Sequence, residues 1–315
     1  MKSMIERKNV RAMRRAIPMP AIRTALTGVS GVVRFHEPMR LHTSFRIGGP
    51  ADAYFEPADE ADLCRVMAQA RKAKVQVFVM GGTNLLVRDG GIRGIVVRLT
   101  KLDRIMEPAG GRLYVEGGVG MPRLLQYALQ QKLAGLEFAA GIPGTLAGSV
   151  VMNAGTKLGE MREVVQSVRV VTPSGAVREI PASDVGFAYR QTRLPRGVVV
   201  GAWLRLRVDR IAGADAVVKE ALRHRKATQP LALPNAGCVF KNPGGDPAGL
   251  LIEAAGLKGA EIGDAQVSTR HANFIVNRRH ATAQEVLSLI RTVGRTVEQR
   301  TGVTLQLEVK IVGEG

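Results

Sequence analysis

The sequence predicts an α+β protein with a strand-rich part up to about residue 208 and a helix-rich part after it. Three observations support this prediction. Apolar segments of strand length recur between glycine-rich turns in the first part, and helical periodicity dominates the last third. No apolar run approaches the roughly 18 to 20 residues that span a bilayer. We place the boundary near residues 208–213.

The first part begins with a helix and continues mainly as strands. Apolar residues at helical spacing predict a helix over 58–73, and a short buried strand over 75–80 runs directly into Gly81. The further elements expected here are strands over 94–99 and 113–119, a helix over 122–133, a glycine-rich connection over 141–155, a hairpin over 165–180 and a strand over 197–208.

The last third contains the longest predicted helix. Thr282 is suited to be its N-cap, and Glu285, three residues later, completes a capping box for a helix that runs to about residue 300. The other elements expected here are a helix over 214–228, a Pro/Gly-rich loop to residue 247, a short helix over 248–256, a strand over 271–277 and an alternating strand over 304–312.

The chain is strongly basic, with a formal net charge of +18. Such an excess suits nucleic acid, but it also suits phosphorylated small molecules. Aromatic residues, on which nucleic-acid bases stack, make up only 4% of the chain, which argues against nucleic acid. Residues 1–25 carry seven cations and one anion, and we interpret them as a solvated basic extension, although their composition is also typical of an organelle transit peptide.

The two cysteines, Cys64 and Cys238, are too few for a disulfide framework, and no Cys/His cluster indicates a metal site. A reducing compartment is the simplest interpretation. Cys64 falls within the helix over 58–73 and is expected to pack there. Cys238 lies in the turn-forming stretch PNAGCVFKNP, beside Lys241, where a chemical role and an inert loop position are both open.

Two glycine-rich loops are suited to hold phosphates. Gly81 to Asn84 follows a strand, and GIPGTLAGS offers a second loop, so that together they could hold both phosphates of a dinucleotide. Ordinary turns would explain each loop equally well. A Rossmann site is not indicated, because GGVGMPR has Arg123 where the third glycine belongs, and no Walker A sequence occurs.

Seven motifs in order link the sequence to a family. They are SFRIGGPA (44–51), VMGGTNLLV (79–87), GIPGTLAGSVVMNAG (141–155), FAYRQTRL (187–194), NAGCVFKNP (235–243), VSTRHANFIVN (267–277) and LQLEVKIVG (305–313). Together they resemble the UDP-N-acetylenolpyruvoylglucosamine reductase family, flavoenzymes that complete UDP-N-acetylmuramate in peptidoglycan synthesis. Each motif alone is weak, but seven in the correct order are highly specific.

The resemblance implies an FAD-binding fold of the vanillyl-alcohol-oxidase type. Residues 26–208 would form two FAD-binding subdomains, and residues 209–315 a substrate domain whose last strand carries Glu308 back to the active site. It further implies non-covalent FAD, NADPH as hydride source and a UDP-sugar substrate. We expect a cytoplasmic monomer of the family's shorter class that does not bind nucleic acid.

The resemblance also assigns roles to individual residues. Catalysis would rest on Arg190, Cys238 and Glu308, and no metal is expected. FAD would be held by Gly81, Gly82, Thr83, Asn84, Leu85, Pro143, Gly144, Thr145, Gly148, Ser149 and Asn153. The substrate contacts would be Tyr189, Lys241, Asn242, Gln266 and Lys310.

The chemistry of the substrate explains these residue types. When hydride adds to the vinyl carbon of the enol ether, negative charge spreads into the substrate carboxylate, which Arg190 can grip through both oxygens. Glu308 would act protonated or share a proton with the intermediate, and Cys238 would donate the final proton. The family more often has Ser at this position. A thiol is more acidic than a hydroxyl, so nearby cations could leave Cys238 as an inactive thiolate.

Two other hypotheses remain open at this point. One is an FAD-dependent oxidoreductase of the same fold that acts on another substrate, and the catalytic trio argues against it. The other is a non-catalytic, basic protein that binds anions or nucleic acid. The net charge motivates this second hypothesis, and the low aromatic content counts against it.

Overall fold

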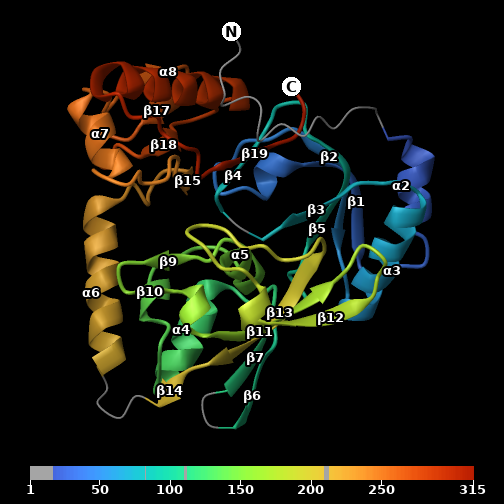
Figure 1. Cartoon of the computed structure of the whole chain (residues 1–315). Coiled ribbons are helices and arrows are strands. Elements are labelled where there is room, and N and C mark those ends of the chain that lie inside the picture. The colour runs from blue at the N-terminus through green and yellow to red at the C-terminus, as the bar shows by residue number, and fades with distance from the viewer. Residues whose placement is uncertain (1–16, 82, 110–111, 209–212) are drawn as a thin grey trace.

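The computed structural model describes residues 17–315, except for residue 82, residues 110–111 and residues 209–212. Two sheets with their helices form most of the molecule, and a smaller helical part lies above the long helix α6 (Gly213–Thr228) at the left of Figure 1. No helix in the described ranges is long and apolar enough to cross a membrane.

The first sheet has the strand order β1-β2-β5-β3. β1 pairs antiparallel with β2, whereas β5 runs parallel to both β2 and β3. Helix α3 begins after Asp59, whose carboxylate accepts a hydrogen bond from the N–H of Asp62 at 2.8 Å. The bounds are β1 Val32–Pro38, β2 Pro50–Glu56, α3 Glu60–Lys72, β3 Val77–Met80 and β5 Ile92–Arg98.

The N-terminal segment differs from the expected solvated extension. Residues 1–16 lie outside the described residues, but Met19–Ala25 forms helix α2, which contacts α3. Ile22 and Ala25 on this helix have no exposed surface and belong to the main hydrophobic core. The sequence did not predict this helix because seven residues contain too few apolar positions to show a helical spacing.

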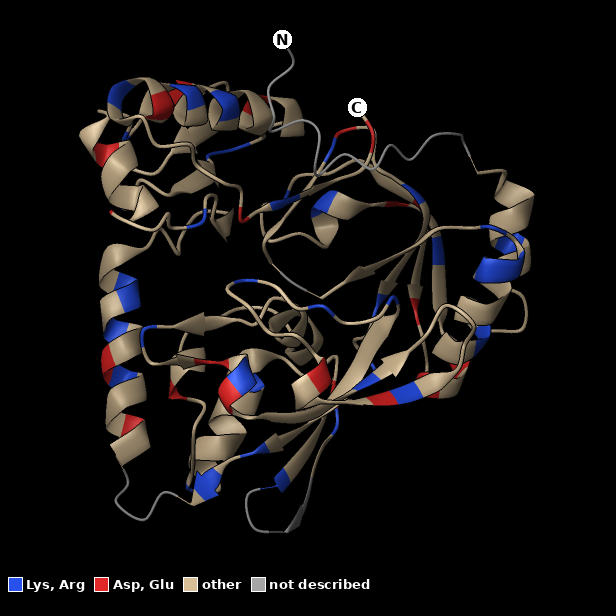
Figure 2. Cartoon of the chain, in the orientation of Figure 1, with Lys and Arg blue, Asp and Glu red and all other residues tan. Residues whose placement is uncertain are grey.

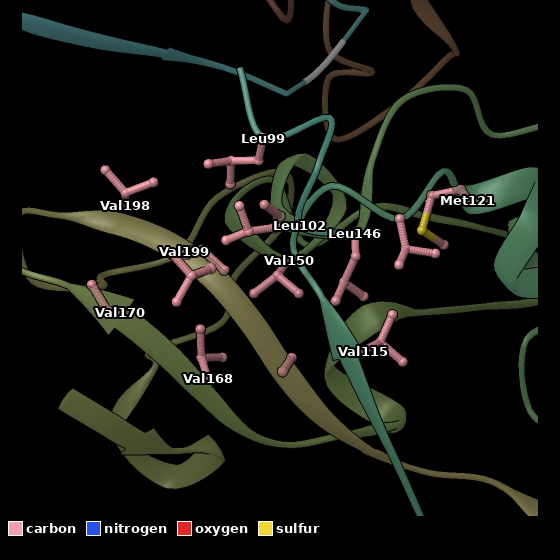
Figure 3. Close-up of a cluster of buried hydrophobic side chains, with 14 of the residues drawn as sticks. Leu99, Leu102, Val115, Met121, Leu146, Val150, Val168, Val170, Val198 and Val199 are labelled. Carbon is pink, nitrogen blue, oxygen red and sulfur yellow. The ribbon is translucent and has the colours of Figure 1, made fainter. Parts of the chain in front are cut away.

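The second sheet has the order β12-β11-β13-β7-β6, with antiparallel pairing throughout. Its apolar face packs against helix α5, where Leu146 and Val150 meet Val115, Val168 and neighbouring strand residues (Figure 3). The bounds are β6 Ile105–Ala109, β7 Arg112–Glu116, α4 Met121–Gln130, α5 Leu146–Val151, β11 Val165–Val171, β12 Val177–Pro181 and β13 Val198–Arg205.

The C-terminal part has its own sheet, of order β15-β18-β17-β16, and its own hydrophobic core. Helix α8 packs on β16 and β17. Charged residues of both signs alternate along α6 and α8 (Figure 2), so neither helix presents a uniformly basic face. The bounds are β15 Asn235–Cys238, α7 Ala248–Ala254, β16 Glu261–Ile262, β17 Ala265–Val267, β18 Phe274–Asn277 and α8 Ala283–Thr301.

The end of the chain returns to the first part of the structure. Strand β19 (Lys310–Val312) pairs in parallel with β4 (Leu85–Val87), which follows the first glycine-rich loop. The strand expected over 304–312 is regular only in these three residues. Glu308 therefore lies before β19 in irregular backbone, because residues 306–309 bond to the segment around Val239 instead of a sheet neighbour.

Short elements connect these layers. The small strands β8 and β14 pair with each other, as do β9 and β10. Their bounds are β8 Leu133–Ala134, β9 Gly155–Thr156, β10 Gly159–Glu160 and β14 Arg207–Val208, and the 3-10 turns are η1 Met39–Leu41, η2 Glu137–Ala139, η3 Met161–Glu163 and η4 Ala182–Asp184.

The strongest local predictions are confirmed. The capping box of α8 forms in both directions, with Thr282 Oγ1 accepting from the N–H of Glu285 at 3.1 Å and the Glu285 carboxylate accepting from the N–H of Thr282 at 2.9 Å. The hairpin of β11 and β12 also forms. In contrast, α5 lies inside the segment expected to be a connection, because its six residues are too few to show a helical period.

The packing of α2 makes a prediction about stability. We expect Ile22→Ala to lower the free energy of unfolding by about 2–4 kcal/mol, because the change leaves a cavity in the main core. Urea denaturation followed by circular dichroism measures this. Leu41→Ala is the control, since Leu41 is 66% exposed and should change stability by less than about 0.5 kcal/mol. Equal effects of the two substitutions would mean that α2 is not part of the cooperative core.

Candidate active site

A cleft of about 1000 Å³ lies between the two glycine-rich loops and the C-terminal part. The catalytic candidates Arg190, Cys238 and Glu308 all line it, although they come from three distant segments of the chain. The cleft is also lined by Gln229 and residues 231–234, from the connection between α6 and β15, and by β15 itself. The structure thus brings together the groups for which the resemblance implies one reaction.

The two glycine-rich loops meet at one side of this cleft. Both the N–H and the Oγ1 of Thr145 donate hydrogen bonds to the carbonyl of Gly81, at 3.0 and 2.9 Å. A Cβ on Gly81 would lie 2.9 Å from Thr145 Oγ1 and 3.5 Å from the amide nitrogen of Gly148. Glycine therefore permits this close approach, and glycine-rich backbone of this kind is suited to hold an anion. The loops fit the pyrophosphate of FAD.

Most described residues expected to hold FAD line the cleft, but three do not. Gly82 lies outside the described residues. Leu85 is buried in β4, where it pairs with Lys310, and the carbonyl of Gly144 accepts a hydrogen bond from Met121. The residues that do line the cleft are Gly81, Thr83, Asn84, Pro143, Thr145, Gly148 and Ser149.

Asn153, the third exception, has no exposed surface. Its Nδ2 donates to the carbonyl of Ala188 at 3.2 Å, and its Oδ1 accepts from the N–H of Arg162 at 3.0 Å. Its side chain thus joins the end of the second glycine-rich loop to the loop that carries Tyr189 and Arg190. Asn153 therefore supports the loop of Tyr189 and Arg190 and does not line the cleft.

Arg190 is held in an unusual conformation. Its φ is +57°, a left-handed backbone that costs a non-glycine residue roughly 1 kcal/mol or more. One guanidinium nitrogen donates to the carbonyl of Gly155 at 2.9 Å, and Nε lies 3.2 Å from Oε1 of Glu308. These contacts fix the guanidinium beside the carboxylate and favour the strained backbone.

Backbone hydrogen bonds hold Cys238 and Glu308 near each other. The N–H of Glu308 donates to the carbonyl of Val239 at 2.8 Å, and the N–H of Lys241 donates to the carbonyl of Gln306 at 2.8 Å. Cys238 is the last residue of β15, next to these bonds. The irregular segment before β19 therefore sets the position of both side chains.

The electrostatics of the site keep the Cys238 thiol protonated. Burial raises its pKa to about 12, the negative charge of Glu308 adds to this effect, and the cations Arg190 and Arg225 oppose it. The risk that nearby cations could leave an inactive thiolate is not realised, because burial and the charge of Glu308 outweigh the cations. Burial also raises the pKa of Glu308, while the charges of Arg190 and Lys241 act against that shift.

The residues expected to contact the substrate are dispersed. Tyr189 and Asn242 line the cleft, and the ring of Tyr189 lies beneath the Arg190 guanidinium at 4.9 Å from its centroid. Lys241, Gln266 and Lys310 are outside the lining of the cleft. Gln266, on β17, donates a hydrogen bond to Glu261 at 2.6 Å.

Among the residues that line the cleft but were not predicted from the sequence are Ser44, Arg225 and Gln229. The hydroxyl of Ser44 lies 2.9 Å from the carbonyl of Thr83 and 2.7 Å from that of Asn235, so it joins the first glycine-rich loop to β15. Its place in the motif SFRIGGPA was a usable signal. Arg225 and Gln229 also line the cleft. No motif marks them in the sequence, because Arg225 is one of several cations on α6 and Gln229 directly follows that helix.

Comparisons with known proteins agree with this geometry. Two family models match: an FAD-binding domain over residues 51–181 and the C-terminal domain of UDP-N-acetylenolpyruvoylglucosamine reductase over residues 229–312. UDP-N-acetylenolpyruvoylglucosamine reductase 2 of Symbiobacterium thermophilum is 47% identical over 90% of this chain and 93% of its own. The reductase of Desulforamulus reducens is 42% identical over 93% and 99% of the two chains.

A solved structure extends this similarity to the fold. The crystal structure of UDP-N-acetylenolpyruvylglucosamine reductase from Thermus caldophilus aligns with a TM-score of 0.78 at 33% identity, covering 90% of this chain and all of the other. The fold is thus the FAD-binding fold of the vanillyl-alcohol-oxidase type with an added C-terminal α+β part. The chain belongs to the UDP-N-acetylenolpyruvoylglucosamine reductase family and is an FAD-dependent oxidoreductase of peptidoglycan synthesis.

Proposed function

We propose that this protein reduces the enolpyruvyl group of UDP-N-acetylglucosamine enolpyruvate, with NADPH as the electron source and Cys238 as the proton donor. The observation that carries the proposal is the convergence of Arg190, Cys238 and Glu308 in one cleft beside two apposed glycine-rich loops. Bound FAD supplies the hydride chemistry. The product gains one hydride and one proton, while NADPH is oxidised to NADP⁺.

Arg190 binds the substrate carboxylate and stabilises the negative charge that develops there after hydride addition. Its guanidinium is planar and presents paired donors, and the contacts to Gly155 and Glu308 hold it in place before substrate arrives. Such preorganised charge stabilises a transition state without a cost of reorganisation. Glu308, whose pKa burial raises, shares a proton with the intermediate and limits the charge of the site.

Cys238 delivers the proton that completes the reaction. Its raised pKa keeps the thiol protonated at neutral pH, so the donor is present when the substrate binds. Protonation of the substrate carbon breaks the S–H bond and leaves a thiolate, which recovers a proton from solvent. A thiol with a pKa of about 12 is closer in acidity to a serine hydroxyl than an ordinary cysteine is.

The remaining roles follow from this assignment. Tyr189 and Asn242 contact the sugar–phosphate part of the substrate within the cleft, while Lys241 and Lys310 supply positive charge towards its diphosphate, and Gln266 contacts the far end. Residues 26–208 form the FAD-binding part and residues 209–315 the substrate part. The enzyme works as a cytoplasmic monomer.

The overall reaction is tested by following NADPH absorbance. We expect sustained NADPH consumption by the FAD-loaded protein to depend on UDP-N-acetylglucosamine enolpyruvate. NADPH can reduce the flavin once without this substrate, but further turnover needs an acceptor that reoxidises the flavin. Anaerobic conditions exclude oxygen as an alternative acceptor. Equal consumption without the enolpyruvyl substrate, or with UDP-N-acetylglucosamine in its place, would refute the proposed substrate.

Cys238→Ala tests the proton donor. We expect stopped-flow reduction of the flavin by NADPH to be unchanged, whereas reoxidation of the reduced flavin by the enol ether should slow by about 10²–10⁴-fold, the usual value of a positioned acid. Cys64→Ala is the matched control, because Cys64 lies on α3 outside the lining of the cleft, and both half-reactions should stay normal. Loss of both half-reactions in Cys238→Ala would indicate misfolding and contradict a specific role.

The raised pKa of Cys238 predicts its reactivity with pH. Because a raised pKa preserves the acid form of a thiol, thiolate should stay scarce until the pH nears 12. Alkylation of Cys238 by iodoacetamide should therefore keep rising about tenfold per pH unit from pH 7 to pH 10. Peptide mass spectrometry measures the rate. A plateau near pH 8 to 9 would show an ordinary thiol.

Alkylation of Cys238 should also inhibit the enzyme. Cys238→Ser should abolish this inhibition by alkylation while retaining substantial activity.

A further inference from the structure

A second hollow, of about 260 Å³, lies where the connection between β1 and β2 and the loop after β4 meet the start of α8. Three arginines line it. Arg40 and Arg46 come from the connection between β1 and β2, and Arg279 comes from the segment between β18 and α8. Arg46 also lines the active-site cleft, so the two cavities are neighbours.

The protein does not neutralise the three guanidinium groups of this hollow. In the part of the chain that the structure describes, the side chains of Arg40, Arg46 and Arg279 have no ion pair and no hydrogen bond. By contrast, Arg93, in the strand that follows, pairs with Asp52 at 2.8 Å. Unpaired cations around one hollow repel one another, and an anion placed between them would replace this repulsion by attraction.

The carboxylate of Asp89, which also lines the hollow, already has partners. Its two oxygens accept hydrogen bonds from the N–H groups of Ala283 and Gln284, at 2.9 and 3.0 Å, in the first turn of α8. The positive end of the helix dipole offsets its charge there. The next N–H, of Glu285, donates to Thr282 Oγ1 at 3.1 Å. The helix end is therefore fully capped, and an anion in the hollow would have to bind to the arginines.

The size and charge of the hollow indicate the class of ligand. Its volume lies below the roughly 300–1,000 Å³ of pockets that hold drug-sized molecules, so it suits a group of a few atoms. Guanidinium groups donate paired hydrogen bonds that match the oxygens of phosphate. A phosphate group carries about two negative charges at neutral pH and three or more acceptor oxygens, so that it can accept from several arginines at once. A carboxylate has one charge and only two oxygens.

We infer that Arg40, Arg46 and Arg279 together bind one phosphate group, either as the free ion or at the end of a larger molecule. The bound anion would link the first sheet to the C-terminal part of the chain, since the three arginines come from both. The turn of Arg46 also carries Ser44, whose hydroxyl contacts the first glycine-rich loop and β15. The anion would thus tighten the junction beside the active-site cleft without occupying the cleft. The inference does not depend on the proposed reaction.

Calorimetric titration of inorganic phosphate into the FAD-loaded protein tests the site. Bound FAD keeps phosphate out of the glycine-rich loops. We expect one phosphate per chain, with a dissociation constant of about 1 mM or lower at low ionic strength. Arg279→Met and Arg40→Met should each weaken binding at least about tenfold, because each removes charge-assisted hydrogen bonds. Arg279→Lys should bind with intermediate affinity, since it keeps the charge but loses the paired donors.

Arg278→Met is the matched control for Arg279→Met. Arg278 is the adjacent residue and carries the same charge, but it pairs with Glu261 at 2.5 Å and does not line the hollow. This variant should bind phosphate as the unmodified protein does. Equal loss of binding in Arg278→Met and Arg279→Met would overturn the inference, as would an absence of binding in the unmodified protein. Equal heats from potassium chloride at matched ionic strength would reduce the effect to screening and refute the site.

Glycerol phosphate, titrated in the same way, distinguishes the two sources of the anion. Binding equal to or tighter than that of inorganic phosphate would show that the hollow accepts the phosphate end of a larger molecule, whereas binding of inorganic phosphate alone would assign the site to the free ion. If Arg40→Met and Arg279→Met each still bind one phosphate with unchanged affinity, the arginines do not share an ion and the inference is wrong. Because the titrations use neither NADPH nor a UDP-sugar, they stand whatever the substrate of the cleft is.

Discussion

The candidate active site depends on the pairing of β19 with β4, the strand that follows the first glycine-rich loop. The parallel pairing of β19 with β4 includes a bond from the N–H of Lys310 to the carbonyl of Asn84, the last residue of the first glycine-rich loop. Glu308 precedes this strand by two residues and can reach Arg190 only while β19 is in place. The same return positions the segment that holds the turn of Cys238. One short pairing thus connects the glycine-rich loops to the three candidate catalytic side chains.

Burial and charge oppose each other at the centre of the cleft. Burial raises the pKa values of Cys238 and Glu308. Arg190 acts to lower both values, together with Arg225 at Cys238 and Lys241 at Glu308, but at Cys238 burial outweighs the cations. The outcome is a site that can carry a proton on each of two groups next to a fixed cation. This balance suits a reaction in which negative charge appears on the substrate and is then neutralised. It also shows how a cysteine can stand where the family more often has serine.

The sequence predicted elements where a local signal was strong, and failed where the position depends on tertiary contacts. The capping box of Thr282 and Glu285 and the helix at 58–73 were recognisable from local pattern. Motif order also pointed to Arg190, Cys238 and Glu308, which the fold brings into one cleft. The burial of α2 was not, because only its contact with α3 makes seven residues a stable helix.

The errors within the site have a similar origin. Asn153 belongs to a motif that implies a cofactor contact, yet its amide joins two backbone segments instead. Glu308 was expected on a regular strand, but its backbone bonds to Val239, a partner from another part of the chain. Arg225 is one of several cations on α6, and only the fold distinguishes it. Motif order identifies the residues, whereas the direction of a side chain follows from partners that the local sequence does not name.

The pairing of β19 with β4 has a consequence for how the enzyme is made. During synthesis the two glycine-rich loops and the second sheet emerge long before β19, so the cofactor cradle can assemble while the strand that completes the catalytic trio is still absent. Contacts between such distant segments form late because they require the closure of a large loop. The pairing of β19 with β4 and the contact of Glu308 with Arg190 therefore form only after the segments of both glycine-rich loops have been synthesised.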